Sequence, residues 1–197
     1  MSRVAGIILA AGGSSRMGGP KQLARLDGQS LVRRTARSVL ASRCAGAFVV
    51  LGAYASEVAA DLRGVPVTLV QSPHWQEGLA HSIRAGIAAV DDAGFDAALL
   101  ALVDQPAVSA ALLDRLIAAL AGAPAGIVAC EYAGTLGPPT LWARSHFGAL
   151  RALSGDRGAK PLLLAHEAGV VRIPFPDGAL DVDTPADLER ARSRLPT

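Results

Sequence analysis

A glycine-rich loop with two cations follows the first apolar stretch of the chain. The stretch VAGIILA (4–10) leads into Gly12 and Gly13, and Arg16 and Lys21 follow shortly afterwards. Glycines let a ligand approach the backbone closely, and successive N–H groups in such a loop can form an anion-binding nest. Arginine adds a bidentate donor and lysine a compact positive charge. These residue types in this order predict a binding site for a polyphosphate.

Common motifs of other enzyme classes do not account for this loop. The dinucleotide-binding pattern GxGxxG does not match, because the glycine pairs 12–13 and 18–19 have a different spacing. A P-loop requires Lys and then Ser or Thr directly after its second glycine, and Gly18 is not followed by these residues. The G-x-S-x-G elbow of serine hydrolases does not occur either.

Two acidic segments offer ligands for a divalent cation. Asp104 follows the apolar stretch AALLALV (97–103), and Asp181 and Asp183 belong to the segment DVDTPADL near the end of the chain. Magnesium prefers oxygen ligands and usually takes one or two carboxylates together with phosphate oxygens. Asp181 and Asp183 point to opposite sides of an extended chain, so only one of them can easily meet an ion held by Asp104. A role in a turn or a helix cap is the alternative for these aspartates.

Short apolar stretches alternate with amphipathic ones and predict the elements that must position these residues. The predicted strands are 4–10, 47–52, 65–70, 97–103, 126–132 and 170–174. The predicted helices are 30–42, 56–63, 79–92, 109–122, 144–155 and 184–195. Most strands are apolar on both faces, as in a parallel sheet that helices cover. We therefore expect a three-layer α/β/α, Rossmann-like fold with a mostly parallel central sheet, in which ligands bind at the carboxyl ends of the strands.

Capping residues support several of these boundaries. N-caps are expected at Ser30, Ser56, Ser109 and Thr184, and helix ends at Gly122 and Gly155. Asp187 follows Thr184 at the position of a capping box, so we expect it to cap the last helix. The Gly- and Pro-rich segment 134–141 interrupts the alternation and is predicted to make an excursion at the edge of the sheet.

Composition bounds the class of protein. The chain has 197 residues, of which 51% are apolar, and a formal net charge of +2 without a block of like charges. We expect one domain over residues 1–197 and no nucleic-acid partner. Cys44 and Cys130 lack metal-site spacing, and no apolar stretch is long enough to span a membrane. The N-terminal apolar run does not resemble a signal peptide, so a cytoplasmic location is predicted.

Several motifs carry a resemblance to a known family. They are LAAGGSSRMGGPKQL, GLAHSIRAGI (78–87), LVDQP (102–106), GPPTLW, GDRGAK (155–160) and DVDTPADL (181–188). With these motifs the chain resembles the molybdenum cofactor cytidylyltransferase branch of the MobA-like nucleotidyltransferase family, nearly from end to end. The resemblance implies transfer of a nucleoside monophosphate from an NTP to a phosphate group, with Mg²⁺ and release of pyrophosphate. It also implies molybdopterin cofactor as the acceptor and a molybdoenzyme as a possible client.

The resemblance assigns roles residue by residue. It implies nucleotide contacts from Leu9, Ala10, Ala11, Gly12, Gly13, Arg16, Lys21, Gln71 and Ser82. It implies catalytic roles for Arg16, Lys21 and Asp104, magnesium ligation by Asp104 and Asp183, and acceptor contacts from Gly137, Pro138, Gly155, Asp156 and Lys160. Ala11 favours CTP, because guanylyl enzymes of the family typically carry glycine there. Gln71 departs from the asparagine that is common in the family, which keeps the amide but moves it by one methylene.

The chemistry expected of this set needs no general base, because the attacking phosphate is already ionised. Catalysis would then consist of positioning and charge neutralisation, with Lys21 neutralising charge as pyrophosphate leaves. Other roles remain open for several residues: Ser82 could cap a helix, the segment 155–160 could be a solvated loop, and Trp75 and Trp142 could pack in the core. A guanylyl or sugar-phosphate nucleotidyltransferase and a non-catalytic cofactor carrier are the alternative functions.

Overall fold

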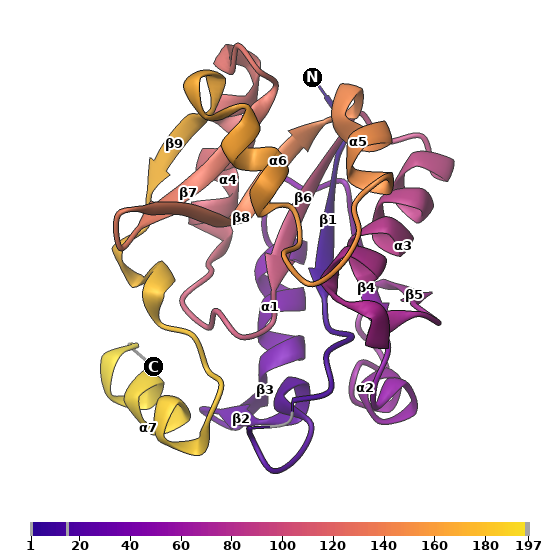
Figure 1. Cartoon of the computed structure of the whole chain (residues 1–197). Coiled ribbons are helices and arrows are strands. Elements are labelled where there is room, and N and C mark those ends of the chain that lie inside the picture. Colours follow the sequence, from indigo (N-terminus) through magenta and orange to yellow (C-terminus); the bar gives the residue numbers. More distant parts are fainter. Residues whose placement is uncertain (1, 15, 196–197) are drawn as a thin grey trace.

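Seven strands form the central sheet of the computed structural model, which describes residues 2–14 and 16–195 (Figure 1). Their order across the sheet is β5-β4-β1-β6-β8-β7-β9. The strands are β1 (Val4–Leu9), β4 (Gly46–Leu51), β5 (Thr68–Gln71), β6 (Ala97–Leu102), β7 (Ile127–Tyr132), β8 (Thr135–Ala143) and β9 (Val171–Pro174). β1 is parallel to β4 and β6, β4 to β5 and β7 to β9, whereas β8 is antiparallel to both of its neighbours. The mostly parallel sheet confirms the predicted fold class.

Helices cover both faces of this sheet. One face carries α1 (Leu31–Leu40), α2 (Ala55–Asp61) and α4 (Ala110–Ala119), and the other carries α3 (Leu79–Asp92), α5 (Phe147–Arg151) and α6 (Lys160–Ala165). Side chains of β1 alternate between the two layers: Ile8 belongs to the first apolar core and Ile7 to the second, and both are fully buried. This double burial explains why the strand sequences are almost continuously apolar.

Smaller elements complete the chain. β2 (Arg25–Leu26) and β3 (Gln29–Ser30) form a short antiparallel ribbon, and α7 (Pro185–Arg194) packs beside β2 away from the main sheet (Figure 1). The 3-10 turns are Lys21–Leu23, Trp75–Glu77, Leu120–Gly122, Arg144–His146, Glu167–Gly169 and Pro176–Ala179. None of the helices in the described ranges is both long and apolar enough to cross a membrane.

Three of the four predicted N-caps are confirmed. The side chains of Ser30, Ser109 and Thr184 accept hydrogen bonds from backbone N–H groups in the first turns of α1, α4 and α7, and Asp187 completes a capping box. Ser56 was a wrong prediction, because it lies inside α2 and Tyr54 occupies the N-cap position with a φ of 57°. Gly122 ends the 3-10 turn that continues α4, as expected.

The segment 134–141 was predicted wrongly as an excursion at the sheet edge. Most of it belongs to β8, which lies inside the sheet between β6 and β7. Pro138 and Pro139 fall where the pairing of β8 with β7 shifts, between Gly137 opposite Cys130 and Thr140 opposite Ala129. The prolines lack an N–H group, and they are tolerated because they sit at the bulge and need no ladder donor there.

The predicted helix 144–155 is also only partly correct. The chain forms a 3-10 turn and then the short helix α5, and it leaves the helix before Gly155. Gly155 has a φ of +74° in the connecting segment and does not end a helix. The segment then enters α6, a helix that the apolar pattern did not indicate because it covers fewer than two turns.

Candidate functional site

The glycine-rich loop follows β1 directly and is fixed by a buried glutamine. The side-chain Nε2 of Gln22 donates hydrogen bonds to the carbonyl oxygens of Ala10, at 2.8 Å, and Gly12, at 2.7 Å. Only 1% of Gln22 is exposed. Ser14 Oγ, which lies 3.3 Å from Gln22 Oε1, accepts a hydrogen bond from the backbone N–H of Lys21 at 3.1 Å. Gln22 therefore holds the loop in shape, a role that the sequence reasoning missed although the residue stands beside Lys21.

Two carboxylates from distant parts of the chain converge on one ammonium group. Lys21 Nζ donates to Asp104 Oδ2 at 2.7 Å and to Asp183 Oδ1 at 2.8 Å. Asp104 follows β6 at its carboxyl end, and a backbone hydrogen bond from Val182 N–H to the carbonyl of Asp104, at 2.8 Å, holds the segment of Asp183 beside it. The structure thus brings together three predicted site residues from distant parts of the sequence.

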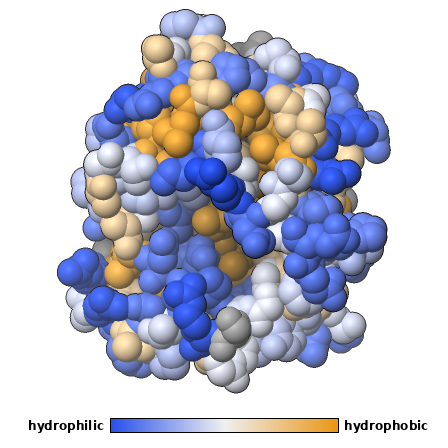
Figure 2. Space-filling view, viewed as in Figure 1, coloured by the Kyte–Doolittle hydropathy of each residue, from blue (hydrophilic) through white to orange (hydrophobic). Residues whose placement is uncertain are grey.

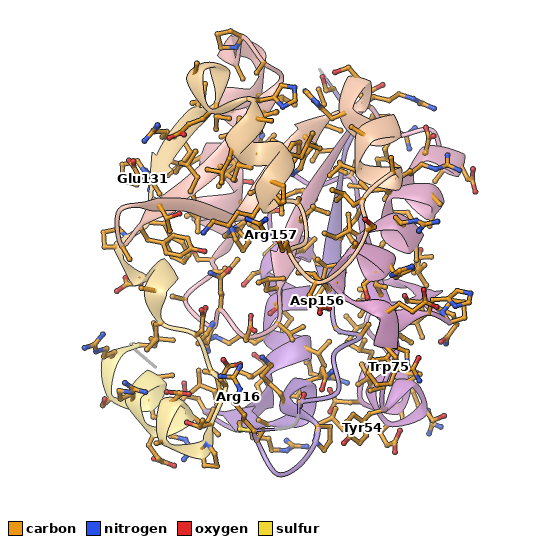
Figure 3. All side chains as sticks on the ribbon, viewed as in Figure 1. Arg16, Tyr54, Trp75, Glu131, Asp156 and Arg157 are labelled. Atoms are coloured by element: carbon orange, nitrogen blue, oxygen red, sulfur yellow. The ribbon has the colours of Figure 1, made fainter. Side chains whose placement is uncertain are left out.

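Arg16 extends this charge cluster toward solvent. Its Nη2 lies 2.9 Å from Asp183 Oδ2, and 72% of its side chain is exposed. Figure 3 shows Arg16 beside the segment that leads into α7. An exposed guanidinium of this kind is free to exchange its carboxylate partner for a phosphate group. Ser15, which precedes Arg16 in the predicted loop motif, lies outside the described residues.

The electrostatics of the cluster follow from burial and close charges. Burial disfavours the Lys21 ammonium, but the charges and hydrogen bonds of Asp104 and Asp183 outweigh it and raise the pKa of Lys21. Burial, together with the negative charges of Asp104 and Asp183, raises the pKa of Asp181 to about 6. The three aspartates therefore repel one another, and a cation between Asp104 and Asp183 relieves that repulsion.

The donor set fits a hard divalent cation such as Mg²⁺. Asp104 Oδ1 is buried and has no hydrogen-bond partner among the described residues, whereas Asp104 Oδ2 faces the Lys21 ammonium together with Asp183 Oδ1. In residues 2–14 and 16–195 no group of three or more His, Cys, Asp or Glu side chains is arranged to hold a metal ion. Two carboxylates are enough for magnesium when phosphate oxygens and water complete the coordination.

A cavity of about 320 Å³ lies above the glycine-rich loop, and we call it the nucleotide cavity. Its lining includes eight of the predicted site residues: Leu9, Ala11, Gly12, Gly13, Lys21, Ser82, Asp104 and Asp156. Trp75 forms part of the wall and packs so closely on the backbone that a Cβ at Gly13 would lie 3.3 Å from its ring. The buried side chain of Ser82 lies in the first turns of α3, whose N-cap position is Gly78.

Some predicted residues lie elsewhere. Gln71 is exposed at the carboxyl end of β5 and is not part of the lining of the nucleotide cavity. Ala10 is buried, and its carbonyl oxygen accepts a hydrogen bond from Gln22 Nε2. The carbonyl of Gly155 accepts a hydrogen bond from Ala80 N–H at 3.1 Å, which ties the loop before α6 to the start of α3.

A second cavity of about 290 Å³ adjoins the first, and we call it the acceptor cavity. Leu9, Leu79 and Leu102 line both cavities, and Gly137, Pro138 and Lys160 line the second. Trp142 is fully buried in its wall, and its Nε1 donates to Thr140 Oγ1 at 2.8 Å. Figure 2 shows a hollow at the centre of this face, with apolar atoms at its floor and hydrophilic residues around it.

The chain is similar to known proteins over most of its length. Residues 6–170 match the model of the MobA-like NTP transferase domain. A molybdenum cofactor guanylyltransferase of Cereibacter sphaeroides is 34% identical over 197 residues, which cover 98% of this chain and 97% of that protein. The nicotine blue oxidoreductase of Paenarthrobacter nicotinovorans is also 34% identical, over 170 residues that cover 81% of each chain.

A solved structure supports the same grouping. Rv0371c of Mycobacterium tuberculosis in complex with manganese has 30% identity and a TM-score of 0.79, and the match covers 98% of this chain and all of that one. The glycine-rich loop after β1, the converging aspartates and the match over most of the chain lead to one conclusion: this protein belongs to the MobA-like NTP transferase family.

Proposed function

We propose that the protein is a Mg²⁺-dependent cytidylyltransferase that transfers CMP from CTP to a phosphorylated small molecule and releases pyrophosphate. The observation that carries this proposal is that Asp104 and Asp183 both contact the Lys21 ammonium beside the glycine-rich loop. A triphosphate in the nucleotide cavity needs both a cradle of backbone donors and cations that neutralise its charge. In this proposal residues 1–197 act as one catalytic domain.

The residues of the chain would divide the work by charge. The N–H groups of the loop hold the phosphates, and Lys21 and Arg16 turn from the carboxylates toward the negative oxygens. Mg²⁺, held by Asp104 and Asp183, would supply further charge neutralisation and fix the orientation of the phosphates. An oxygen of the acceptor phosphate forms a bond to the α-phosphorus, the bond to the bridging oxygen breaks, and pyrophosphate leaves with that electron pair. The new product contains a diphosphate link, and no proton needs to be removed.

The choice of CTP rests on Ala11, which lines the nucleotide cavity together with Ser82. A methyl group at this position narrows the space for a base compared with the glycine that guanylyl enzymes of the family carry. Molybdopterin cofactor is the proposed acceptor and a molybdoenzyme the proposed client of the product. We place this activity in the cytoplasm, without a nucleic-acid or membrane partner.

The first experiment measures nucleotide binding in the presence of Mg²⁺. Binding of CTP, GTP, ATP and UTP is detected as a shift in the thermal unfolding curve. A ligand at 100 times its Kd stabilises the folded state by about 2.7 kcal/mol, which gives a clear shift in Tm. We expect the largest shift with CTP and loss of its Mg²⁺-dependent part in Asp104→Asn. The largest shift with GTP would instead support a guanylyltransferase. If no nucleotide shifts Tm, the carrier function becomes the better explanation.

A second assay separates transfer from other chemistry in this family. Release of pyrophosphate from CTP in the presence of molybdopterin cofactor is the expected signal. Since one relative is named an oxidoreductase, oxidation of NADH and NADPH should be followed in parallel. Oxidation of either dinucleotide without release of pyrophosphate would contradict the proposed function.

A further inference from the structure

The acceptor cavity differs in chemistry from the nucleotide cavity. Its wall consists mainly of apolar side chains from β1, α3, β6, β8 and α6, among them Leu9, Ile83, Leu100, Leu136, Trp142 and Leu163. We propose that the acceptor is an organic phosphate whose body is a flat ring system, and that the apolar faces of these rings pack against the wall of the acceptor cavity. This inference rests on the proposed function and narrows it, because it excludes sugar and polyol phosphates as the acceptor.

The polar atoms in the wall are few and partly engaged. Thr140 Oγ1 accepts the hydrogen bond of Trp142 Nε1 at 2.8 Å, and Tyr132 Oη accepts one from Gln105 Nε2 at 3.1 Å. A sugar or polyol would bury several hydroxyl groups here, and each buried hydroxyl without a partner costs free energy. The faces of a flat ring system gain free energy from the same wall, because their surface leaves water.

Two cations at the rim supply the charge that a phosphate needs. Arg157 and Lys160 both line the cavity and are exposed. Within the described ranges, neither side chain makes an ion pair or a hydrogen bond. Figure 3 shows Arg157 on the loop before α6, near the centre of this face. Unpaired cations at the mouth of an apolar cavity suit a ligand that is apolar at one end and anionic at the other.

The loop 155–160 connects the two cavities. Asp156 lines the nucleotide cavity, whereas its neighbour Arg157 lines the acceptor cavity (Figure 3). Leu9, Leu79 and Leu102 line both cavities, so the two cavities adjoin along these side chains. An acceptor whose body fills one cavity can therefore present its phosphate group to a nucleotide in the other.

Tyr132 gives this side of the site a fixed shape. A Cβ at Gly178 or Gly137 would collide with its ring or hydroxyl group, so these two glycines provide the space for it. Gln105, which follows Asp104 directly, donates to Tyr132 Oη and to the carbonyl of Gly178 at 3.0 Å. The wall of the acceptor cavity is thus connected to the segment that bears the proposed metal ligand.

The test compares two probes by isothermal titration of the full chain, with and without Mg²⁺ and the non-hydrolysable CTP analogue CMPCPP. The probes are 1-naphthyl phosphate and glycerol 3-phosphate, which share a phosphate group and differ in the body. Because burial of an aromatic ring system is favourable, we expect 1-naphthyl phosphate to bind at least about tenfold more tightly. Equal affinities, or a preference for glycerol 3-phosphate, would overturn the inference.

Three variants show whether binding occurs in this cavity. Ala159→Leu places a larger side chain in the apolar wall, and Arg157→Ala removes one rim cation. Each variant should bind 1-naphthyl phosphate about tenfold more weakly and bind CMPCPP as the wild type does. Ala159→Leu loses space for the probe, and Arg157→Ala loses a charge-assisted hydrogen bond to its phosphate. Arg63→Ala is the matched control, because Arg63 is exposed and lies outside both cavities. Unchanged probe binding in both test variants would refute the cavity assignment.

The design separates this inference from the proposed function. If CMPCPP fails to bind, the nucleotidyltransferase proposal fails, and the titrations of the probes without nucleotide still decide which body the cavity accepts. If CMPCPP binds and the probes show no preference, only the acceptor class is wrong. Melting temperatures of the variants within a few degrees of the wild type show that the wall has not unfolded.

Discussion

The nucleotide cavity and the acceptor cavity share a wall but recognise ligands in different ways. The nucleotide cavity combines backbone groups of the glycine-rich loop with Lys21 and Asp104, whose charges are already paired. The acceptor cavity has an apolar wall, and the side chains of its rim cations Arg157 and Lys160 have no charged partner in the part of the chain that the structure describes. In one cavity the paired charges hold the site in shape before a ligand arrives, and in the other apolar packing does so.

This difference assigns different consequences to substitutions on the two sides. Changes in the nucleotide cavity alter charge neutralisation and should affect the rate of transfer and the binding of metal. Changes in the acceptor cavity alter the fit of the acceptor and should mainly affect its KM. The predictions below test this separation.

The largest effect is expected from Asp104→Asn, which keeps the shape of the side chain and removes its charge. We expect the rate of pyrophosphate release to fall by about 10²- to 10³-fold, because the ion between Asp104 and Asp183 loses one of its two carboxylates. Ala159→Leu in the acceptor cavity is the contrast and should raise KM for the acceptor with a smaller change in kcat. Steady-state assays over a range of Mg²⁺ concentrations measure both, and an unchanged Mg²⁺ requirement in Asp104→Asn would argue against metal binding there.

A large effect on stability is expected from Gln22→Leu, which has a similar volume. The variant loses both hydrogen bonds from Nε2 and leaves the carbonyls of Ala10 and Gly12 without them. We expect the free energy of unfolding to fall by about 1–3 kcal/mol, because the buried carbonyl of Ala10 is left unsatisfied, whereas water can reach the carbonyl of the exposed Gly12. Urea denaturation measures the change. Gln76 lines the same cavity but is exposed, so Gln76→Leu is the control. It should change the free energy of unfolding by less than about 0.5 kcal/mol.

The nucleotide side of the fold was more predictable from the sequence than the acceptor side. Parallel strands that are buried on both faces have an apolar signature, and caps such as Ser30 mark helix starts by local chemistry. The loop after β1 and Asp104 after β6 could be placed together, because carboxyl ends of parallel strands meet at one edge. The hydrogen bonds from Gln22 to the glycine-rich loop could not be predicted, since a buried polar side chain has no local sequence signature.

The acceptor side depends on pairings between distant segments. β8 lies between β6 and β7 and pairs with both in the antiparallel direction. Its prolines are typical of a loop, but the strand tolerates them because they lie at the bulge near Cys130. The break between α5 and α6 likewise follows from packing of the intervening loop against Ala80. For the same reason Asp183 could only be favoured over Asp181 by resemblance, because the backbone bond between Val182 and Asp104 is a long-range contact.

A moderate effect is expected from Lys21→Met on metal binding without nucleotide. In the wild type an ion that reaches Asp104 and Asp183 must displace the Lys21 ammonium from both oxygens. Without that competing charge, Mn²⁺ should bind about tenfold more tightly, which corresponds to about 1.4 kcal/mol. Electron paramagnetic resonance of free Mn²⁺ measures the affinity independently of activity. Lys160→Met, at the rim of the acceptor cavity, is the control and should leave Mn²⁺ binding unchanged.

The smallest effect is expected from Asp181→Asn on the pH dependence of stability in metal-free protein. The pKa of Asp181 rises from 3.8 to about 6 on folding, so the folded state binds more protons between these values. The free energy of unfolding of the wild type should therefore fall as pH rises from about 4 to about 6 and stay lower above it. Burial of the Asp181 carboxyl is only partial and the residue as a whole is exposed, so solvent screens its charge. The variant should therefore be more stable by only about 1 kcal/mol at about pH 8 and nearly equal at about pH 4. Urea denaturation at both pH values measures the difference, with the exposed Asp92→Asn as the control. A gain in stability that is the same at both pH values would show that ionisation of Asp181 is not its cause.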